Sequence, residues 1–176
     1  GGTLDVITGN VIRRSGNQLT VRGATLIRAS GSVVFNDEVN ILLDQLERDT
    51  TVSRQLSTDL YGRQDISVGQ RIMVFGEMSD DETQLNAAHV RMLLTTIKGN
   101  LVFAESGTVS VDLTAIDGRN IDLFDFTGTG AISDANPAEY VVDVADLNTD
   151  GLDTATPLKI RGFVTPFDHA ADVALY

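Results

Sequence analysis

Residues 8–11 read TGNV, and residues 98–101 read KGNL. Two further pairs of stretches recur in the same order: RIMVFG at 71–76 with PLKIRG at 157–162, and AAHV at 87–90 with AADV at 170–173. The three offsets are 90, 86 and 83 residues. Matching segments that keep their order at a nearly constant spacing indicate two tandem copies of one small domain.

The composition suits two small domains rich in strands. A length of 176 residues allows two units of roughly 85–90 residues, each large enough for a modest core. Hydrophobic residues make up 42% of the chain and Trp is absent, so the core must be built mainly from Val, Ile and Leu. The β-branched members of this set favour strands.

The net charge of −12 is unevenly distributed along the chain. Residues 1–97 hold 9 basic and 12 acidic side chains, whereas residues 98–176 hold 4 basic and 13 acidic ones. Proteins bind nucleic acids by neutralising phosphates with Lys and Arg. The negative charge therefore argues against DNA, RNA or an anionic membrane surface as a partner. It suits a protein whose acidic surface keeps it soluble, or a surface that binds or tolerates cations.

The chain holds no cysteine, which excludes disulfides, thiolate metal sites and a cysteine nucleophile. No apolar run approaches the length of a membrane span. The sequence begins Gly1-Gly2 without a methionine, and we expect an export signal or lipid-anchor segment upstream of it.

In the first copy, alternating segments separated by turn residues predict strands. Residues 6–13 and 18–21 form a hairpin around Ser15-Gly16-Asn17, 71–76 is a strong strand, and 84–94 closes the unit. Residues 44–65 are polar and predict a long excursion with one short strand around Val52.

Residues 32–48 allow two interpretations. Alternate apolar residues from Val33 to Ile41 predict two strands that turn at Asn36 and Asp37. The apolar spacing from Val39 to Leu46 also fits a helix over 36–48. We favour strands, because one period-two pattern covers both halves of the segment.

The second copy repeats the plan with different loops. Asn136 caps a single helical turn that has Pro137 at its first position. The predicted strands are 99–105, 108–113, 120–126, 140–144, 158–164 and, closing the unit, 171–176.

These patterns predict an all-β protein with little helix, made of two tandem small antiparallel β-barrels over residues 1–95 and 96–176. Five or six short strands with a long middle excursion are typical of an OB-fold. A β-sandwich is the alternative, but it usually has about seven evenly spaced strands. No linker separates the copies, so we expect them to pack closely.

Two runs also resemble a known family. DISVGQRIMVFGEM with LNAAHVRM, and GTVSVDLTAIDGRNIDLFDFTGTG with LKIRGFVTPF, look like a family of bacterial cell-envelope proteins of unknown function. Its members resemble strings of OB-like repeats, often behind a lipoprotein signal. The resemblance implies a fold and, together with the expected upstream segment, a location in the periplasm or cell envelope of a bacterium, where a lipid anchor would tether the protein to a membrane. It carries over no activity or catalytic residue.

One loop has a metal-binding pattern. Asp146, Asn148 and Asp150, followed by Gly151, match the first half of an EF-hand calcium loop, in which alternate oxygens converge on the ion. Position 12 of such a loop is Pro157 rather than a bidentate Glu, and the flanking segments predict strands. An acidic turn between strands is the alternative interpretation.

Other residue groups carry weaker patterns. His89 and His169 are the only histidines, and the sequence has no Gly-x-Ser-x-Gly elbow. Phe163 and Phe167 are candidate ligand-binding aromatics, because OB-folds bind ligands by stacking, although such residues often fill a core.

We therefore expect a non-enzymatic extracytoplasmic binding or scaffolding module whose ligand is a protein or glycan and not nucleic acid. No cofactor is expected, with Ca²⁺ as the possible exception. The alternative function is a calcium-binding domain of, or accessory to, a secreted hydrolase.

Overall fold

The computed structural model describes residues 4–44, 49–105, 107–127, 134–144 and 151–164, without the side chains at 23–24 and 34–37. Over these residues the chain is all-β, as predicted. Its described helical elements are three short 3-10 turns: η1 (Arg63–Asp65), η2 (Ile121–Leu123) and η3 (Pro137–Glu139).

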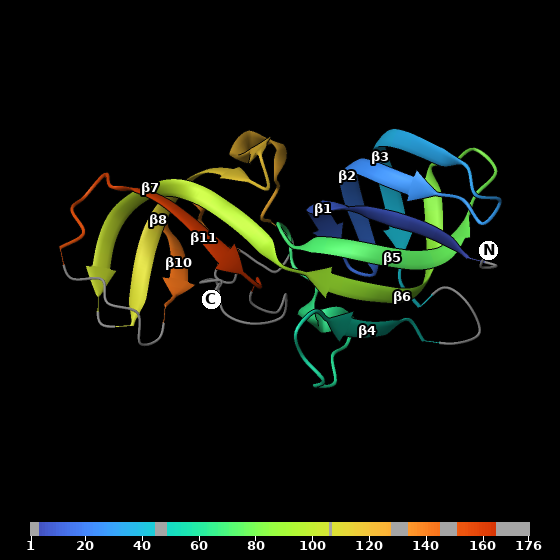
Figure 1. Ribbon diagram of the computed structural model, residues 1–176, viewed down its shortest axis with the longest axis horizontal. Helices are drawn as coiled ribbons and strands as arrows, with labels where there is room; N and C mark the ends of the chain where they lie inside the picture. The colour runs from blue at the N-terminus through green and yellow to red at the C-terminus, as the bar shows by residue number, and fades with distance from the viewer. Residues whose placement is uncertain (1–3, 45–48, 106, 128–133, 145–150, 165–176) are drawn as a thin grey trace.

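The first sheet closes into a five-stranded barrel (Figure 1). Neighbouring strands run antiparallel in the order β3-β2-β1-β5-β6, and a parallel pairing of β3 with β6 joins the two ends. A sixth short strand, β4, pairs in parallel with β6 outside the closed ring. The strands are β1 (Asp5–Ser15), β2 (Gln18–Ile27), β3 (Val33–Leu42), β4 (Thr51–Arg54), β5 (Arg71–Met78) and β6 (Gln84–Leu93).

The second sheet has the order β10-β8-β7-β11, and β9 pairs with β8 off this path. Its strands are β7 (Thr95–Glu105), β8 (Thr108–Ile116), β9 (Arg119–Asn120), β10 (Tyr140–Asp143) and β11 (Pro157–Gly162). This is the order of the first barrel without a fifth strand. The predicted closing strand at 171–176 lies outside the described residues.

Strand register confirms the internal repeat. Val11 faces Val21 in the first hairpin, and Leu101 faces Val111, each residue displaced by 90 positions. The β-bulge after Val11 recurs after Leu101. Bulges increase the twist of a strand, so both copies bend their first strand in the same place.

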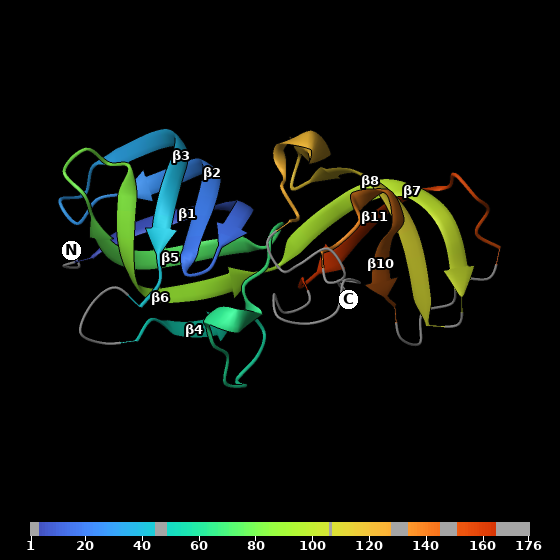
Figure 2. The same cartoon turned by 180° about the vertical axis from the view of Figure 1, so that it is seen from behind.

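The two sheets share one apolar core. The first sheet ends at Leu93, and β7 begins at Thr95 (Figure 2). Fully buried Ile72 and Val74 of the barrel belong to the same cluster as Val111 and Ile116 of the second sheet. Close packing of the two copies is therefore confirmed.

The predicted hairpin at Asn36 and Asp37 is wrong. Residues 33–42 form one continuous strand, because β3 pairs with β2 along its whole length, from Val33 opposite Ile27 to Leu42 opposite Gln18. The strand interpretation is confirmed as far as Leu42, the last residue of β3. Val39 and Ile41 on this strand are buried in the core. Residues 45–48 lie outside the described part of the chain.

The predicted strand at 120–126 is also wrong beyond its first residue. The Asn120 side chain accepts a hydrogen bond from the Asp122 amide (2.9 Å) and caps η2 instead of extending β9. Short polar side chains compete with sheet pairing in this way. The helical turn at 137–139 is confirmed, with Asn136 accepting from the Ala138 amide (3.0 Å).

Gly99 allows β7 and β8 to approach closely. A Cβ at this position would lie 2.2 Å from the Asp112 carbonyl oxygen and 2.6 Å from Val111 Cγ1. We expect Gly99→Ala to lower the free energy of unfolding by about 1–3 kcal/mol, because backbone and core must both shift. Urea denaturation measures this, with Glu105→Ala on the exposed end of β7 as the control. Equal stabilities of the two variants would contradict the prediction.

Asp5 fastens one end of the barrel. Its carboxylate accepts from the amides of Ala29 (2.7 Å) and Met78 (3.0 Å) and from Arg28 Nε (3.1 Å). Burial raises the pKa of Asp5, but the bonds from Ala29, Met78 and Arg28 outweigh it and hold the pKa below its ordinary value.

A carboxyl group with a lowered folded-state pKa stabilises the fold above its unfolded pKa of about 3.9, and this contribution is lost as the pH falls through the folded value. We expect Asp5→Asn to lower the unfolding free energy by about 1–3 kcal/mol at neutral pH. The deficit should shrink as the pH is lowered below about 4. Urea denaturation over a pH series, with Asp112→Asn as the exposed control, checks this. A deficit independent of pH would refute it.

Candidate functional site

Buried polar side chains join the two sheets where β6 passes into β7. Gln70 is fully buried, and its Nε2 donates to the carbonyl oxygens of Leu93 (2.5 Å) and Arg71 (2.8 Å). Its Oε1 accepts from the Val164 amide (3.0 Å), which follows β11. One amide thus links the end of the barrel to the end of the second sheet.

A second network centres on the turn after β8. Asp117 and Gly118 both have positive φ, 46° and 78°, as in the two-residue Asp-Gly turns that join antiparallel strands. The Asp117 carboxylate accepts from the Thr96 amide (2.9 Å) and from Asn10 Nδ2 (2.7 Å). The turn therefore ties the second sheet to β1 of the barrel.

Asn10 completes this network from the barrel side. It is 1% exposed, and its Nδ2 also donates to the Gly69 carbonyl (3.2 Å). Its Oδ1 accepts from Arg119 Nη1 (3.1 Å). The position of the Arg119 guanidinium is therefore fixed by a buried amide of the other sheet.

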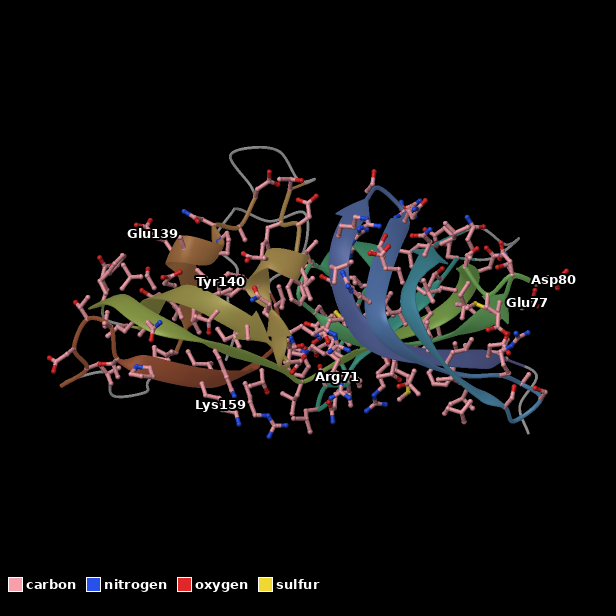
Figure 3. All side chains as sticks on the ribbon, turned by 90° about the horizontal axis from the view of Figure 1, so that it is seen from above. Arg71, Glu77, Asp80, Glu139, Tyr140 and Lys159 are labelled. Carbon is pink, nitrogen blue, oxygen red and sulfur yellow. The ribbon has the colours of Figure 1, made fainter. Side chains whose placement is uncertain are left out.

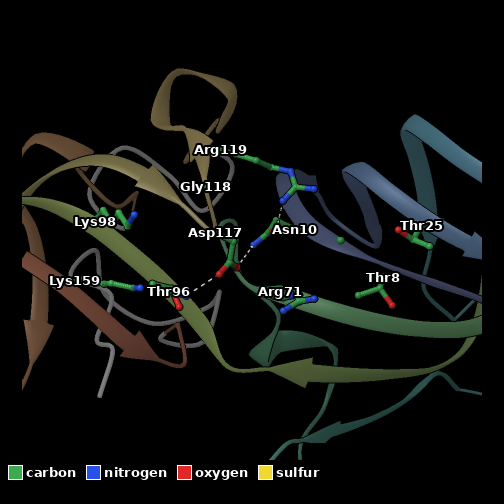
Figure 4. A pocket seen from close by; sticks show the side chains of 11 residues that line it. Thr8, Asn10, Thr25, Arg71, Thr96, Lys98, Asp117, Gly118, Arg119 and Lys159 are labelled. Carbon is green, nitrogen blue, oxygen red and sulfur yellow. Dashed lines mark hydrogen bonds between the residues drawn. The ribbon is translucent and has the colours of Figure 1, made fainter.

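A cleft of about 430 Å³ opens at this seam (Figure 4). Both sheets contribute to its walls, and we call it the seam cleft. Its lining contains four cationic side chains and one acidic side chain, Asp117, which is already engaged by Asn10 and Thr96. The lining residues are Thr8, Gly9, Asn10, Thr25, Arg71, Thr96, Lys98, Asp117, Gly118, Arg119 and Lys159.

Lys98 and Lys159 are the only lysines of the chain, and both line the seam cleft. They face each other directly across the β7–β11 pair. Like charges placed directly opposite on neighbouring strands destabilise a sheet. A negative group between or above the two ammonium groups would relieve this repulsion.

The described residues supply no acidic partner for these cations. Arg13, Arg28 and Arg63 form ion pairs with carboxylates, whereas no described carboxylate forms an ion pair with Lys98, Lys159 or Arg71. Figure 3 shows Arg71 near the middle of the molecule, Lys159 to its left on the second sheet, and Glu77 and Asp80 at the far tip of the barrel. The seam cleft is thus a cationic region on an acidic protein.

The lining also limits the kind of ligand. Among the described residues, no aromatic side chain lines the seam cleft. Unstacked bases gain much of their binding energy from aromatic platforms. The lining consists of cations, hydroxyls and one amide, which suits carboxylate, sulfate or phosphate oxygens.

The residues predicted from sequence lie elsewhere or outside the described chain. Phe163 is 5% exposed, and the Arg54 guanidinium stands 4.4 Å from its ring centre, so a ligand could stack there only if Arg54 moved. Phe167, Asp146, Asn148 and Asp150 lie outside the described residues. Within the described ranges, no group of three or more His, Asp or Glu side chains is placed to hold a metal. The metal and aromatic sites stay predictions.

His89 lies between two hydroxyl groups on the outside of the barrel. Thr51 Oγ1 is 2.7 Å from Nδ1, and Ser53 Oγ is 2.8 Å from Nε2. Burial and then Arg91 lower the pKa of His89, so the ring is neutral at pH 7. Since Thr51 donates to the Ala88 carbonyl (3.3 Å), it accepts from Nδ1–H, and Ser53 donates to Nε2. These bonds fasten β4 to β6; His169 lies outside the described residues.

Sequence reasoning missed Lys98, Lys159, Arg71 and Arg119. A signal for the lysines was present in the repeat. Lys98 lies in the segment that matches residues 8–11, and Lys159 lies in the segment that matches residues 71–76. Since β1 pairs with β5 in the first copy, the repeat implies that the strands of Lys98 and Lys159 pair in the second copy.

Comparisons with known proteins give no independent guide to this site. The chain matches no family model, no curated protein and no solved structure. In the described residues, no helix is long and apolar enough to cross a membrane. The function must therefore be argued from the residues of the seam.

We expect Asn10→Asp to lower the free energy of unfolding by about 3 kcal/mol or more, because a carboxylate would face Asp117 and the Gly69 carbonyl in a buried place. Asn100 is the repeat counterpart of Asn10 and is only half-buried, so Asn100→Asp is a matched control. Urea denaturation at pH 7 measures both. Similar losses in the two variants would show that the seam network is not what stabilises this junction.

Proposed function

We propose that this protein is a non-enzymatic binding module that takes an anionic group of its ligand into the seam cleft. The observation that carries the proposal is the facing pair Lys98 and Lys159, which has no acidic partner among the described residues and shares the cleft with Arg71 and Arg119. An anion there relieves the repulsion between the cations and gains charge-assisted hydrogen bonds.

The size and rigidity of the cleft support this function. A volume of about 430 Å³ lies within the usual range for ligand sites. Arg119 is held by Asn10, and both lysines stand on strands. Because the Arg119 guanidinium is already ordered by Asn10, binding to it loses less conformational entropy than binding to a free side chain would.

We further propose that the ligand belongs to a protein or glycan met outside the cytoplasm, with nucleic acid disfavoured. The net charge of −12 supports this, because a long polyanion would meet repulsion beyond the cleft. The lack of a described aromatic platform in the lining also disfavours bases.

Citrate, a small tricarboxylate, is a suitable probe for the seam cleft. We expect isothermal titration at low salt to show that citrate binds the unaltered protein, and that Lys98→Gln/Lys159→Gln weakens this binding by about tenfold or more. The binding should also weaken as the ionic strength rises.

The matched control is Arg13→Gln/Arg91→Gln, which removes the same charge from side chains outside the cleft. It should leave citrate binding nearly unchanged, because the Arg13–Glu38 ion pair is exposed and screened. The proposal fails if citrate does not bind, or if both double variants weaken binding equally.

A further inference from the structure

We propose that the anionic ligand is an extended acidic peptide segment whose carboxylates recur at every second residue, lying along β7 and β11. This inference rests on the proposed function and specifies its ligand. It is carried by the shape of the surface beside the seam cleft and by the register of the two strands.

A second hollow of about 440 Å³ adjoins the seam cleft. The two hollows share Lys98 and Lys159, so the lysine pair stands at the junction between them. Asn100, Thr114, Pro157 and Leu158 line the second hollow farther from the seam. The two hollows together, which we call the groove, extend from the seam along β7 and β11, and a single small anion would occupy only part of them.

The cations follow the strand period. Lys159 and Arg161 are two residues apart on β11, both are exposed, and they lie opposite Lys98 and Thr96. Alternate residues of a strand share one face and repeat at about 6.6–6.8 Å. An extended peptide has the same two-residue repeat, so carboxylates at alternate positions can meet successive cations in step.

The ends of the groove fit the same ligand. At the seam end, Arg71 and Arg119 add two positive charges from the barrel and the β8–β9 turn. Beyond the lysine pair, Asn100 and Thr114 offer an amide and a hydroxyl, which can bond to peptide groups. Clusters of basic side chains are a recurring means of recognising acidic motifs.

An acidic glycan fits the groove less well. Among the described lining residues of both hollows, Pro157 and Leu158 are the only apolar side chains, and none is aromatic. A sugar ring would find no broad apolar surface on which to pack, whereas a peptide backbone between acidic side chains needs only polar partners.

Two peptides of identical composition test the inference. One has Glu and Thr in strict alternation, and the other has all Glu in one half and all Thr in the other. Fluorescence anisotropy with the full chain at about 50 mM salt compares them. We expect the alternating peptide to bind about tenfold tighter, because only its carboxylates match the strand repeat.

Substitutions in the protein test where the peptide binds. Lys98→Gln/Lys159→Gln should abolish the difference between the two peptides. Arg161 lies outside the two linings but opposite Thr96 of the seam cleft, and Arg161→Gln should weaken the alternating peptide about threefold to tenfold. Arg91→Gln, with the same change of charge on β6, should not. Equal weakening by Arg161→Gln and Arg91→Gln would overturn the proposed path along β11.

The citrate titration separates this inference from the proposed function. If citrate binds but the two peptides bind equally, or an oligogalacturonate of equal charge binds more tightly than the alternating peptide, the inference fails while the anion site stands. If citrate itself does not bind, both fail.

Discussion

Asn10 is the point at which the two sheets are held together. Its buried amide bonds to the Gly69 carbonyl, the Asp117 carboxylate and the Arg119 guanidinium, so one side chain satisfies three groups, one from the barrel and two from the β8–β9 turn. A buried polar group without partners costs about 1–3 kcal/mol, and any sliding of one sheet on the other would break several of these bonds at once. The shared apolar core alone would not impose this geometry, because hydrophobic contacts are not directional.

This constraint explains how a cationic cleft can exist on a protein with a net charge of −12. Charges at the exposed surface are screened over about 8–10 Å at physiological salt, so the acidic tip of the barrel at Glu77 and Asp80 has little influence at the seam (Figure 3). Within the cleft, four cationic side chains outnumber the single carboxylate of Asp117. The whole-chain charge therefore argues against long polyanions but says little about a short acidic segment.

Sequence patterns predicted the strands of both copies where alternation and turn glycines agree, as at Ser15-Gly16-Asn17 and in residues 71–76. They failed where a local signal competed with long-range pairing. Asn36 and Asp37 look like a turn, yet pairing with β2 carries β3 straight through them. Residues 121–126 look like the continuation of a strand, yet the Asn120 side chain caps η2 and β9 ends at this residue. The cleft escaped prediction because its cations come from four separate segments and meet only through the packing of the two sheets.

The repeat shows which part of the site is special to one copy. Lys98 and Lys159 occupy the positions that Thr8 and Met73 occupy in the barrel, and these residues also face each other. The barrel folds with a neutral pair at this place, so the fold does not require the two lysines. The lysine pair is thus an addition that the architecture can do without and that weakens the sheet carrying it, and this is the reason why the proposed anion site is placed there.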